Sequence, residues 1–339
     1  MSIFKSLEEA KHRRRRLLRR RFVSFVLVGT GGYFAYRWWR SRPQALIQRQ
    51  ASYLTPNRDF YSVAIRPGFR PRVDADSWRL RVEGPAGSRE YGLAELRRGE
   101  VLKTVRTLCC VGNPVGGTAV GNAEWTAVPL ATVLEPVLGD VPADWRVTFH
   151  ALDGFYSSVP LSLALDPESI LAWEMNGVEL PAAHGYPLRV LLPGRYGMKQ
   201  PRWLEKITVQ QGGSGYWERR GWCSECRLHM LSRIDSARPA SDGGWAVRGV
   251  AFCGEKAVGR VEISADDGAR WLAARLLDPA LPNAWVRWEA RWQPPGGGEY
   301  VLGVRVCDEA GNRQEETVSG AWPSGATGLH RVIVRVPAG

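Results

Sequence analysis

The sequence has 339 residues, which is enough for two domains, and its apolar and charged fractions of 44% and 24% are those of a globular protein. The net charge is +12, but residues 1–42 carry +10 of it, with twelve Lys and Arg against two Glu. The remaining 297 residues are therefore nearly neutral. This distribution excludes a broad basic face, and we expect no nucleic-acid partner.

The N-terminal residues predict a segment that crosses a membrane. Seven arginines at positions 13–16 and 19–21 precede an apolar, aromatic-rich run from Phe22 to Trp39. As a helix this run would span about 27 Å, just enough for the core of a bilayer. Because arginines favour the cytoplasmic side of a span, we expect a basic cytoplasmic segment at 1–21, a transmembrane anchor or export signal at 22–40, and the body on the periplasmic or extracytoplasmic side.

Arg19-Arg-Arg-Phe-Val23 also resembles a twin-arginine export signal, which would carry a folded, cofactor-loaded protein across a membrane. No small-x-small cleavage site follows the apolar run, and this favours an uncleaved anchor over a removed signal. An incidental arginine pair in an arginine-rich flank explains the motif equally well. Both interpretations stay open.

The body of the chain divides into a mixed region and an all-β region. Residues 41–54 have the composition of a polar linker. Up to residue 218, helical spacing predicts helices near 94–96 and 128–138, so we expect an α+β domain at 55–218. Apolar runs predict strands of this domain at 78–84, 101–108, 146–151, 188–192 and 207–210.

After residue 218, short alternating strands are separated by turns rich in Asp, Pro and Gly. The strands are predicted at 245–251, 259–264, 284–292 and 300–308. Evenly spaced strands over about 100 residues are typical of a β-sandwich. We therefore expect a β-sandwich at 219–339.

The most informative motif is the sequence Thr107-Leu-Cys-Cys-Val-Gly-Asn-Pro-Val-Gly-Gly117. A thiol that ends a buried strand and enters a glycine-rich loop is well placed as a soft metal ligand. The strand fixes its position, and the glycines let backbone amides approach a bound group. A buried structural role is the commoner fate of a single cysteine. The motif alone leaves both roles open.

Together with its continuation, Asn122-Ala-Glu-Trp125 and Val128-Pro-Leu130, this motif resembles a segment of the sulfite oxidase family of molybdopterin-dependent oxidoreductases. In that family the segment gives molybdenum its only protein thiolate. The resemblance implies that Cys110, not Cys109, is the metal ligand, and that the cofactor is molybdenum-molybdopterin. Further blocks resemble the same family in order and spacing, at 153–161, 171–177, 184–194 and 196–204.

These blocks imply a set of cofactor contacts. A pterin that bears a phosphate needs cationic donors and backbone amides, while His and Asp side chains can bond its heterocycle. The block at 55–62 resembles the family's first cofactor-contacting segment and adds two residues to the set. The implied contacts are Tyr61, Ser62, Asp153, His184, Arg189, Lys199, Gln200, Pro201 and Arg202.

The resemblance continues into the predicted sandwich. The segments 232–235, 261–268, 285–288 and 308–314 are similar to the family's immunoglobulin-like dimerisation domain. The resemblance therefore implies a sulfite-oxidase-like molybdopterin-binding domain at 55–218, an immunoglobulin-like dimerisation domain at 219–339, and a homodimer.

Several residues depart from the pattern of sulfite oxidases, which surround their dianionic substrate with arginines and a tyrosine. Ser62–Ile65 stands where these enzymes carry an Arg and a His, Pro114 replaces an Arg, and Phe155 replaces the catalytic tyrosine. The loss of desolvated Arg contacts weakens the binding of a dianion. Tyr156 and Arg195 remain as candidates for a catalytic role beside Cys110, although neighbouring strand residues face opposite sides.

We therefore expect two-electron oxygen-atom transfer on a small substrate other than sulfite. The sequence has no Cys-x-x-Cys-His haem motif, so electrons would pass to or from a separate cytochrome or quinone-linked partner. The alternative is a cofactor-free, membrane-anchored binding module that uses the β-sandwich. The intact cofactor motifs count against this alternative.

Four cysteines lie outside the motif. Cys223-Ser-Glu-Cys226 is a single pair and weak evidence for zinc. A local disulfide, which an oxidising compartment would permit, and two free thiols are both open. Cys253 and Cys307 lie in the predicted sandwich, and we expect them in its core; whether they pair with each other is open.

Overall fold

The computed structural model describes residues 42–49 and 51–338. The basic segment predicted at 1–21 and the membrane anchor predicted at 22–40 lie outside these residues. Within the described ranges, no helix is long and apolar enough to cross a bilayer.

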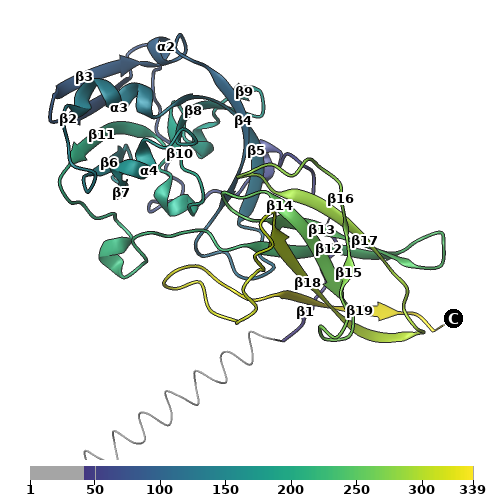
Figure 1. Cartoon of the computed structure of the whole chain (residues 1–339). Coiled ribbons are helices and arrows are strands. Elements are labelled where there is room, and N and C mark those ends of the chain that lie inside the picture. Colours follow the sequence, from purple (N-terminus) through teal and green to yellow (C-terminus); the bar gives the residue numbers. More distant parts are fainter. Residues whose placement is uncertain (1–41, 50, 339) are drawn as a thin grey trace, which may run out of the picture. The chain divides into compact units, whose positions relative to one another are not determined.

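The first sheet of residues 55–218 consists of β2 (Arg79–Gly84), β3 (Gly87–Gly92), β6 (Arg146–Ala151), β7 (Tyr156–Pro160) and β11 (Leu204–Gln210). Its strand order is β3-β2-β11-β6-β7 (Figure 1). Only β11 and β2 run parallel, and the other neighbours are antiparallel. Leu80 and Val82 of β2 alternate with exposed neighbours, because one face of the sheet packs on the core.

The second sheet consists of β4 (Leu102–Cys109), β5 (Val120–Pro129), β8 (Ile170–Met175), β9 (Val178–Glu179) and β10 (Arg189–Leu191). Its order is β10-β8-β5-β4, with β9 paired to β8, and every pair is antiparallel. One apolar cluster joins the two sheets, with Phe149 and Ile207 from the first and Leu171 and Val190 from the second. This cluster is the core of the region.

The α+β prediction is wrong, because the protein is mainly β. The described residues contain three short α-helices, α2 (Leu93–Leu96), α3 (Ala131–Leu138) and α4 (Leu161–Ala164). The apolar run at 128–138 has helical spacing, but Val128 and Pro129 complete strand β5 and the helix begins only at Ala131. The described chain also has the 3₁₀ turns η1 (Asn57–Asp59), η2 (Ala182–His184), η3 (Gly197–Lys199) and η4 (Glu218–Arg220).

The C-terminal region has the two-sheet packing expected of a sandwich. One sheet consists of β12 (Leu231–Pro239), β13 (Trp245–Phe252), β17 (Val286–Trp292) and β16 (Arg275–Leu276), in that order. The other consists of β1 (Gln44–Ala45), β19 (His330–Val336), β18 (Gly298–Asp308), β14 (Val258–Ser264) and β15 (Leu272–Ala273), in that order. Both sheets contribute to one core cluster, which contains Val247 and Trp288 from the first and Val261 and Val304 from the second.

Part of the predicted linker belongs to the sandwich. Strand β1 pairs in parallel with β19, and the amide of Arg49 donates to the carbonyl oxygen of Asp235 at 2.6 Å. Residues 44–49 are therefore bonded to the C-terminal sheets instead of forming a free connector. The boundary that we place near residue 219 stays a prediction.

The two regions meet around the cysteine motif. The amide of Thr107 donates to the carbonyl oxygen of Asn283 at 2.8 Å, and the amide of Trp285 donates to the Thr107 hydroxyl at 2.8 Å. One apolar cluster contains Cys109 from the first region and Phe252 and Trp285 from the sandwich. The strand that carries the motif is thus held by both regions.

Candidate active site

A cavity of about 270 Å³ opens beside the end of β4, and most of the predicted cofactor contacts line it. Their side chains come from the end of a strand, from 3₁₀ turns and from loops, so the chain brings together segments that are far apart in the sequence. The predicted residues in its wall are Tyr61, Cys110, Asp153, His184, Arg189, Gln200, Pro201 and Arg202.

The cysteine motif places its two thiols on different sides of the chain. Strand β4 ends at Cys109, whose side chain is buried in the cluster between the two regions. Cys110 lies in the cavity wall, and its amide donates to the carbonyl oxygen of Ala119 at 2.9 Å. Burial raises the pKa of both thiols. Of the two thiols, Cys110 is therefore the one that lines the cavity.

The loop that follows Cys110 is braced by the sandwich. Arg233 of β12 donates to the carbonyl oxygen of Gly117 at 2.8 Å and is ion-paired with Asp235. A Cβ atom on Gly116 would lie 2.2 Å from the ring of His330, so only glycine allows this contact. The position of the cavity thiol thus depends on strands β12 and β19.

Two guanidinium groups give the cavity wall its positive charge. Arg189 is 4% exposed, and its Nη1 donates to the carbonyl oxygen of His184 at 2.9 Å. Arg202 donates to the hydroxyl of Ser62 at 2.6 Å. Burial, together with the charge of Arg202, lowers the pKa of Arg189 to about 9, and burial lowers the pKa of Arg202 to about 10. Both groups stay charged at neutral pH.

His184 is held as a neutral ring beside these charges. Burial lowers the pKa of His184 to about 4, and the charges of Arg189 and Arg202 add to this effect. Its Nε2 lies 2.7 Å from the carbonyl oxygen of Asn57, so Nε2 carries the proton and Nδ1 is left as an acceptor. The ring can therefore accept a hydrogen bond from a bound ligand.

Asp153 and Tyr61 add polar groups to the wall. Asp153 is buried at the turn after β6, where its carboxylate accepts the amide of Phe155 at 3.0 Å. The hydroxyl of Tyr61 would lie 2.6 Å from a Cβ atom on Gly197, so glycine is required at this close approach. Burial raises the pKa of Tyr61 well above its ordinary value. The phenol therefore remains a hydrogen-bond donor.

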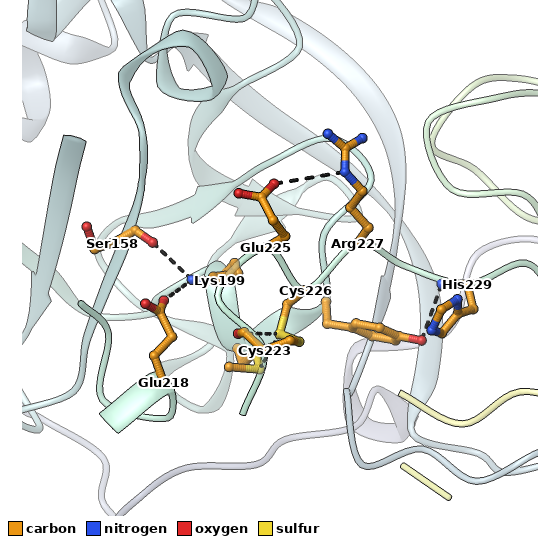
Figure 2. The surroundings of a disulfide bond; sticks show 10 residues. Ser158, Lys199, Glu218, Cys223, Glu225, Cys226, Arg227 and His229 are labelled. Carbon is orange, nitrogen blue, oxygen red and sulfur yellow. Dashed lines mark hydrogen bonds and ion pairs between the residues drawn. A yellow bond between two sulfur atoms is a disulfide. The ribbon is translucent and has the colours of Figure 1, made fainter. Parts of the chain in front are cut away.

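Two predicted contacts lie behind the wall instead of in it. Lys199 is 1% exposed, and its ammonium is ion-paired with Glu218 and donates to the carbonyl oxygen of Ser158 at 3.0 Å (Figure 2). Burial lowers the pKa of Lys199, while the hydrogen bond to Glu218 opposes this shift. Ser62 is exposed and accepts a hydrogen bond from Arg202. The partners of Lys199 do not line the cavity, whereas the partner of Ser62, Arg202, does.

The structure does not bring Tyr156 and Arg195 into the cavity. Phe155 lines it, whereas Tyr156, the first residue of β7, does not and packs against His150 and Tyr216, at ring distances of 6.5 Å and 6.0 Å. Arg195 is buried in a separate small pocket, and its guanidinium lies 3.9 Å from the carboxylate of Glu225. This placement gives no support to the catalytic roles predicted for these two residues.

The cavity also contains residues that the sequence did not single out. Trp217, Trp222 and Met198 line it, next to a disulfide that joins Cys223 to Cys226 with an S–S distance of 2.10 Å (Figure 2). The only signal in the sequence is the aromatic-rich stretch before the Cys-x-x-Cys pair. The free-thiol alternative for this pair does not hold. Cys253 and Cys307 are buried, as expected, and they are not joined to each other.

Comparisons with known proteins agree with the geometry of the cavity. Residues 68–217 match the family described as the oxidoreductase molybdopterin binding domain. The chain is 31% identical to sulfite oxidase from Gallus gallus over 322 residues, which cover 80% of this chain and 70% of that protein. The chain belongs to the sulfite oxidase family. It is an oxidoreductase, and its cofactor is molybdenum-molybdopterin.

Other members of the sulfite oxidase family and its fold are also similar. Mitochondrial sulfite oxidase from Homo sapiens is 30% identical over 80% of this chain, which spans 59% of the human protein. A candidate protein-methionine-sulfoxide reductase subunit from Azospira oryzae is 33% identical over 152 residues, 44% of this chain and 56% of that protein. The sulfane dehydrogenase of Paracoccus pantotrophus shares the fold, with a TM-score of 0.73 at 20% identity, over 86% of this chain and 85% of that chain.

The described residues of the cavity fit the cofactor. The Nε of Arg189 is buried without a hydrogen-bond partner, and among the described residues no carboxylate is ion-paired with Arg189 or Arg202. One buried and one half-buried cation without an ion-pair partner call for an anion, which the phosphate of a pterin would supply. Cys110 offers a soft ligand for molybdenum in the same cavity.

Proposed function

We propose that this protein reduces a small, neutral sulfoxide to a thioether. The observation that carries the proposal is the apolar lining of the cavity at the positions where the resemblance to sulfite oxidases leads us to expect Arg, His and Tyr. Val63, Ala64, Ile65 and Phe155 line the cavity there. A dianion would lose its hydration at these side chains without gaining charged partners, whereas a neutral molecule has little charge to desolvate.

The overall reaction consumes two electrons and two protons for each sulfoxide. The sulfur–oxygen bond breaks, the sulfur is reduced, and a thioether and water are formed. When it is bound, the molybdenum cofactor supplies a centre that exchanges two electrons and one oxygen atom. The name of the Azospira oryzae relative, which refers to the reduction of protein methionine sulfoxide, supports this direction.

The residues of the chain hold the cofactor and shape the substrate space. Cys110 would bind the metal through its sulfur, while Arg189 and Arg202 would pair with the phosphate of the pterin. Neutral His184 would accept a hydrogen bond at Nδ1 and protonated Tyr61 would donate one. The apolar residues of the wall would exclude water from the substrate.

We also infer the setting in which the reaction takes place. Electrons would come from a separate protein, as expected from the sequence. The resemblance of residues 219–339 to a dimerisation domain supports a homodimer. The Cys223–Cys226 disulfide supports a body that works in an oxidising, extracytoplasmic compartment, because such compartments preserve disulfides.

The proposal predicts that the cofactor-loaded protein oxidises reduced benzyl viologen when dimethyl sulfoxide is added, with two viologen radicals consumed per sulfoxide. The matched variants are Cys110→Ser and Cys109→Ser. We expect Cys110→Ser to lower turnover by at least about 100-fold and to lose molybdenum, because the cavity thiol is gone. Cys109→Ser should keep its metal and most of its turnover.

Sulfite provides the opposing measurement, with ferricyanide as the electron acceptor. If sulfite gave a higher kcat/KM than every sulfoxide tested, the assignment of a neutral substrate would be wrong. If the Cys110→Ser variant retained molybdenum and the Cys109→Ser variant lost it, the assignment of Cys110 as the metal ligand would be overturned.

A further inference from the structure

Two tryptophans stand in the wall of the cavity that holds the Cys110 thiol. The rings of Trp217 and Trp222 pack edge to face, with their planes at 71° and their centroids 6.3 Å apart, and we call this pair the aromatic wall. The amide of Trp222 donates to the carbonyl oxygen of Trp217 at 3.1 Å, which closes a tight turn around η4. Both side chains are only partly buried. They therefore present ring surface to whatever enters the cavity.

One end of the aromatic wall is fixed by a buried ion pair. Glu218 follows Trp217 directly, and its carboxylate pairs with the ammonium of Lys199. The side chains are 9% and 1% exposed, respectively. Ser158 adds its carbonyl oxygen at 3.0 Å from the same ammonium (Figure 2). Removing either charged partner would leave a buried charge unpaired, so this contact resists displacement.

The other end is fixed by the disulfide. Cys223 follows Trp222 directly, and its partner Cys226 has its sulfur 3.2 Å from that of Met198, which itself lines the cavity. The amide of Tyr196 donates to the carbonyl oxygen of Cys226 at 3.2 Å. Both ends of the wall are thus attached to residues 196–199, next to the predicted cofactor contacts Gln200 and Arg202.

We propose that Trp217 and Trp222 determine substrate specificity by binding the organic group of the substrate, and that the Cys223–Cys226 disulfide positions Trp222 for this contact. The inference rests on the proposed sulfoxide reduction and names its substrate class as sulfoxides with an apolar or aromatic substituent. Aromatic rings bind such substituents through apolar contact and edge-to-face packing. The polar sulfur–oxygen end would then point away from the rings.

The test compares two sulfoxides of different size on the cofactor-loaded protein, with reduced benzyl viologen as the donor. Methyl p-tolyl sulfoxide reaches the aromatic wall, whereas dimethyl sulfoxide has no ring to place there. We expect Trp222→Ala to raise the KM for the aryl sulfoxide roughly tenfold, with less than about a twofold change for dimethyl sulfoxide. Trp222→Phe should recover most of the loss, because it retains an aromatic face.

The positioning role of the disulfide is tested by the double variant Cys223→Ser/Cys226→Ser. We expect the same selective rise in KM for the aryl sulfoxide, with unchanged molybdenum content. Trp271→Ala is the matched control for Trp222→Ala. Trp271 lies in the sandwich, where the central guanidinium carbon of Arg305 is 3.9 Å from the centroid of the Trp271 ring. This control should leave both KM values unchanged.

The outcomes separate the aromatic wall from the proposed function. If the wild type reduces both sulfoxides and Trp222→Ala changes the two KM values equally or not at all, the wall does not set specificity. If the wild type is fully loaded with molybdenum and reduces no sulfoxide, the proposed function fails. Isothermal titration calorimetry with methyl p-tolyl sulfide then tests the aromatic wall by binding alone. If the wall binds the aryl group, Trp222→Ala weakens the affinity for this thioether roughly tenfold, and an unchanged affinity overturns the inference.

Discussion

Arg189 places a buried positive charge in the cavity wall. A guanidinium that is 4% exposed and has no carboxylate partner among the described residues destabilises the cofactor-free protein. The face of Trp125 lies 5.0 Å from its central carbon and offsets only part of this cost. The same unpaired charge is what an anionic cofactor requires. Stability of the empty protein and affinity for the cofactor are therefore opposed at this residue.

This opposition predicts that Arg189→Met has effects of opposite sign. The cofactor-free variant should gain about 1–3 kcal/mol in free energy of unfolding, because a buried charge with an unsatisfied donor is removed. The variant from a cofactor-producing host should contain several-fold less molybdenum. Urea unfolding and metal analysis measure the two effects.

Arg106→Met is the matched control for Arg189→Met. Arg106 is also buried, at 8% exposure, and its Nε likewise has no hydrogen-bond partner, but its guanidinium is ion-paired with Glu168 and lies outside the cavity, so the two residues differ in the ion pair. This variant should keep its molybdenum and gain no stability. The free energies of unfolding of the two variants are compared. If Arg189→Met lost as much stability as Arg106→Met, the charge of Arg189 would be compensated within the protein.

At the scale of elements, the turn after η2 determines how closely the two cavity arginines approach. Gly185 has a φ of 123°, a conformation that favours glycine. A Cβ atom there would lie 3.1 Å from the Cβ atoms of both Arg189 and Arg202. The turn therefore packs against β10 and the 200–203 loop with no room for a side chain.

We expect Gly185→Ala to destabilise the protein by about 2–3 kcal/mol, from backbone strain together with displacement of both arginines. Gly177→Ala is the matched control, since Gly177 has a φ of 76° with open space around its Cβ position. It should cost only about 1 kcal/mol and leave cofactor retention unchanged. Urea unfolding and molybdenum content distinguish the two variants, and equal losses of metal would contradict the role given to Gly185.

The elements that could be predicted from sequence are those with a clear period. Strand β6 has the predicted bounds, Arg146–Ala151, because its apolar residues alternate. The helix predicted at 128–138 failed at its start, since Val128 and Pro129 belong to strand β5 of the second sheet, where pairing with β8 outweighs helical spacing. Strand β8 was missed as a strand, because a fully buried run shows no alternation.

The candidate site was predictable where it follows continuous motifs and not where it depends on tertiary contacts. The residues around Cys110, His184 and Arg189 come from blocks that carry the family resemblance. Trp217 and Trp222 reach the cavity only through the Lys199–Glu218 ion pair and the disulfide, which join separate segments. No local pattern encodes such a pairing.

At the scale of the whole molecule, the sandwich supports the loop that follows Cys110. His330 of β19 contacts Gly116, and its Nδ1 accepts the amide of Ile234 at 3.0 Å. Burial lowers the pKa of His330 to about 4, and the charges of Arg233 and Arg49 add to the shift. The neutral ring is therefore part of the contact between the two regions, and protonation would place a third positive charge beside these arginines.

This linkage predicts a loss of stability in mild acid. The folded pKa of about 4 lies below the unfolded value of about 6.5, so the unfolded chain binds the proton first as the pH falls. The neutral His330 ring makes its full contribution to the free energy of unfolding above about pH 6.5. Below that pH, this contribution decreases by about 1.4 kcal/mol per pH unit down to pH 4. His330→Asn keeps an acceptor for the Ile234 amide in its Oδ1 but has no ring to protonate. We expect it to reduce the slope of the free energy of unfolding against pH by the equivalent of up to one proton. Urea unfolding at pH 7, 6 and 5 measures both slopes. His184 retains its own low pKa in both proteins, so it contributes equally to both slopes. Equal slopes in the wild type and the variant would therefore show that His330 is not the group that titrates.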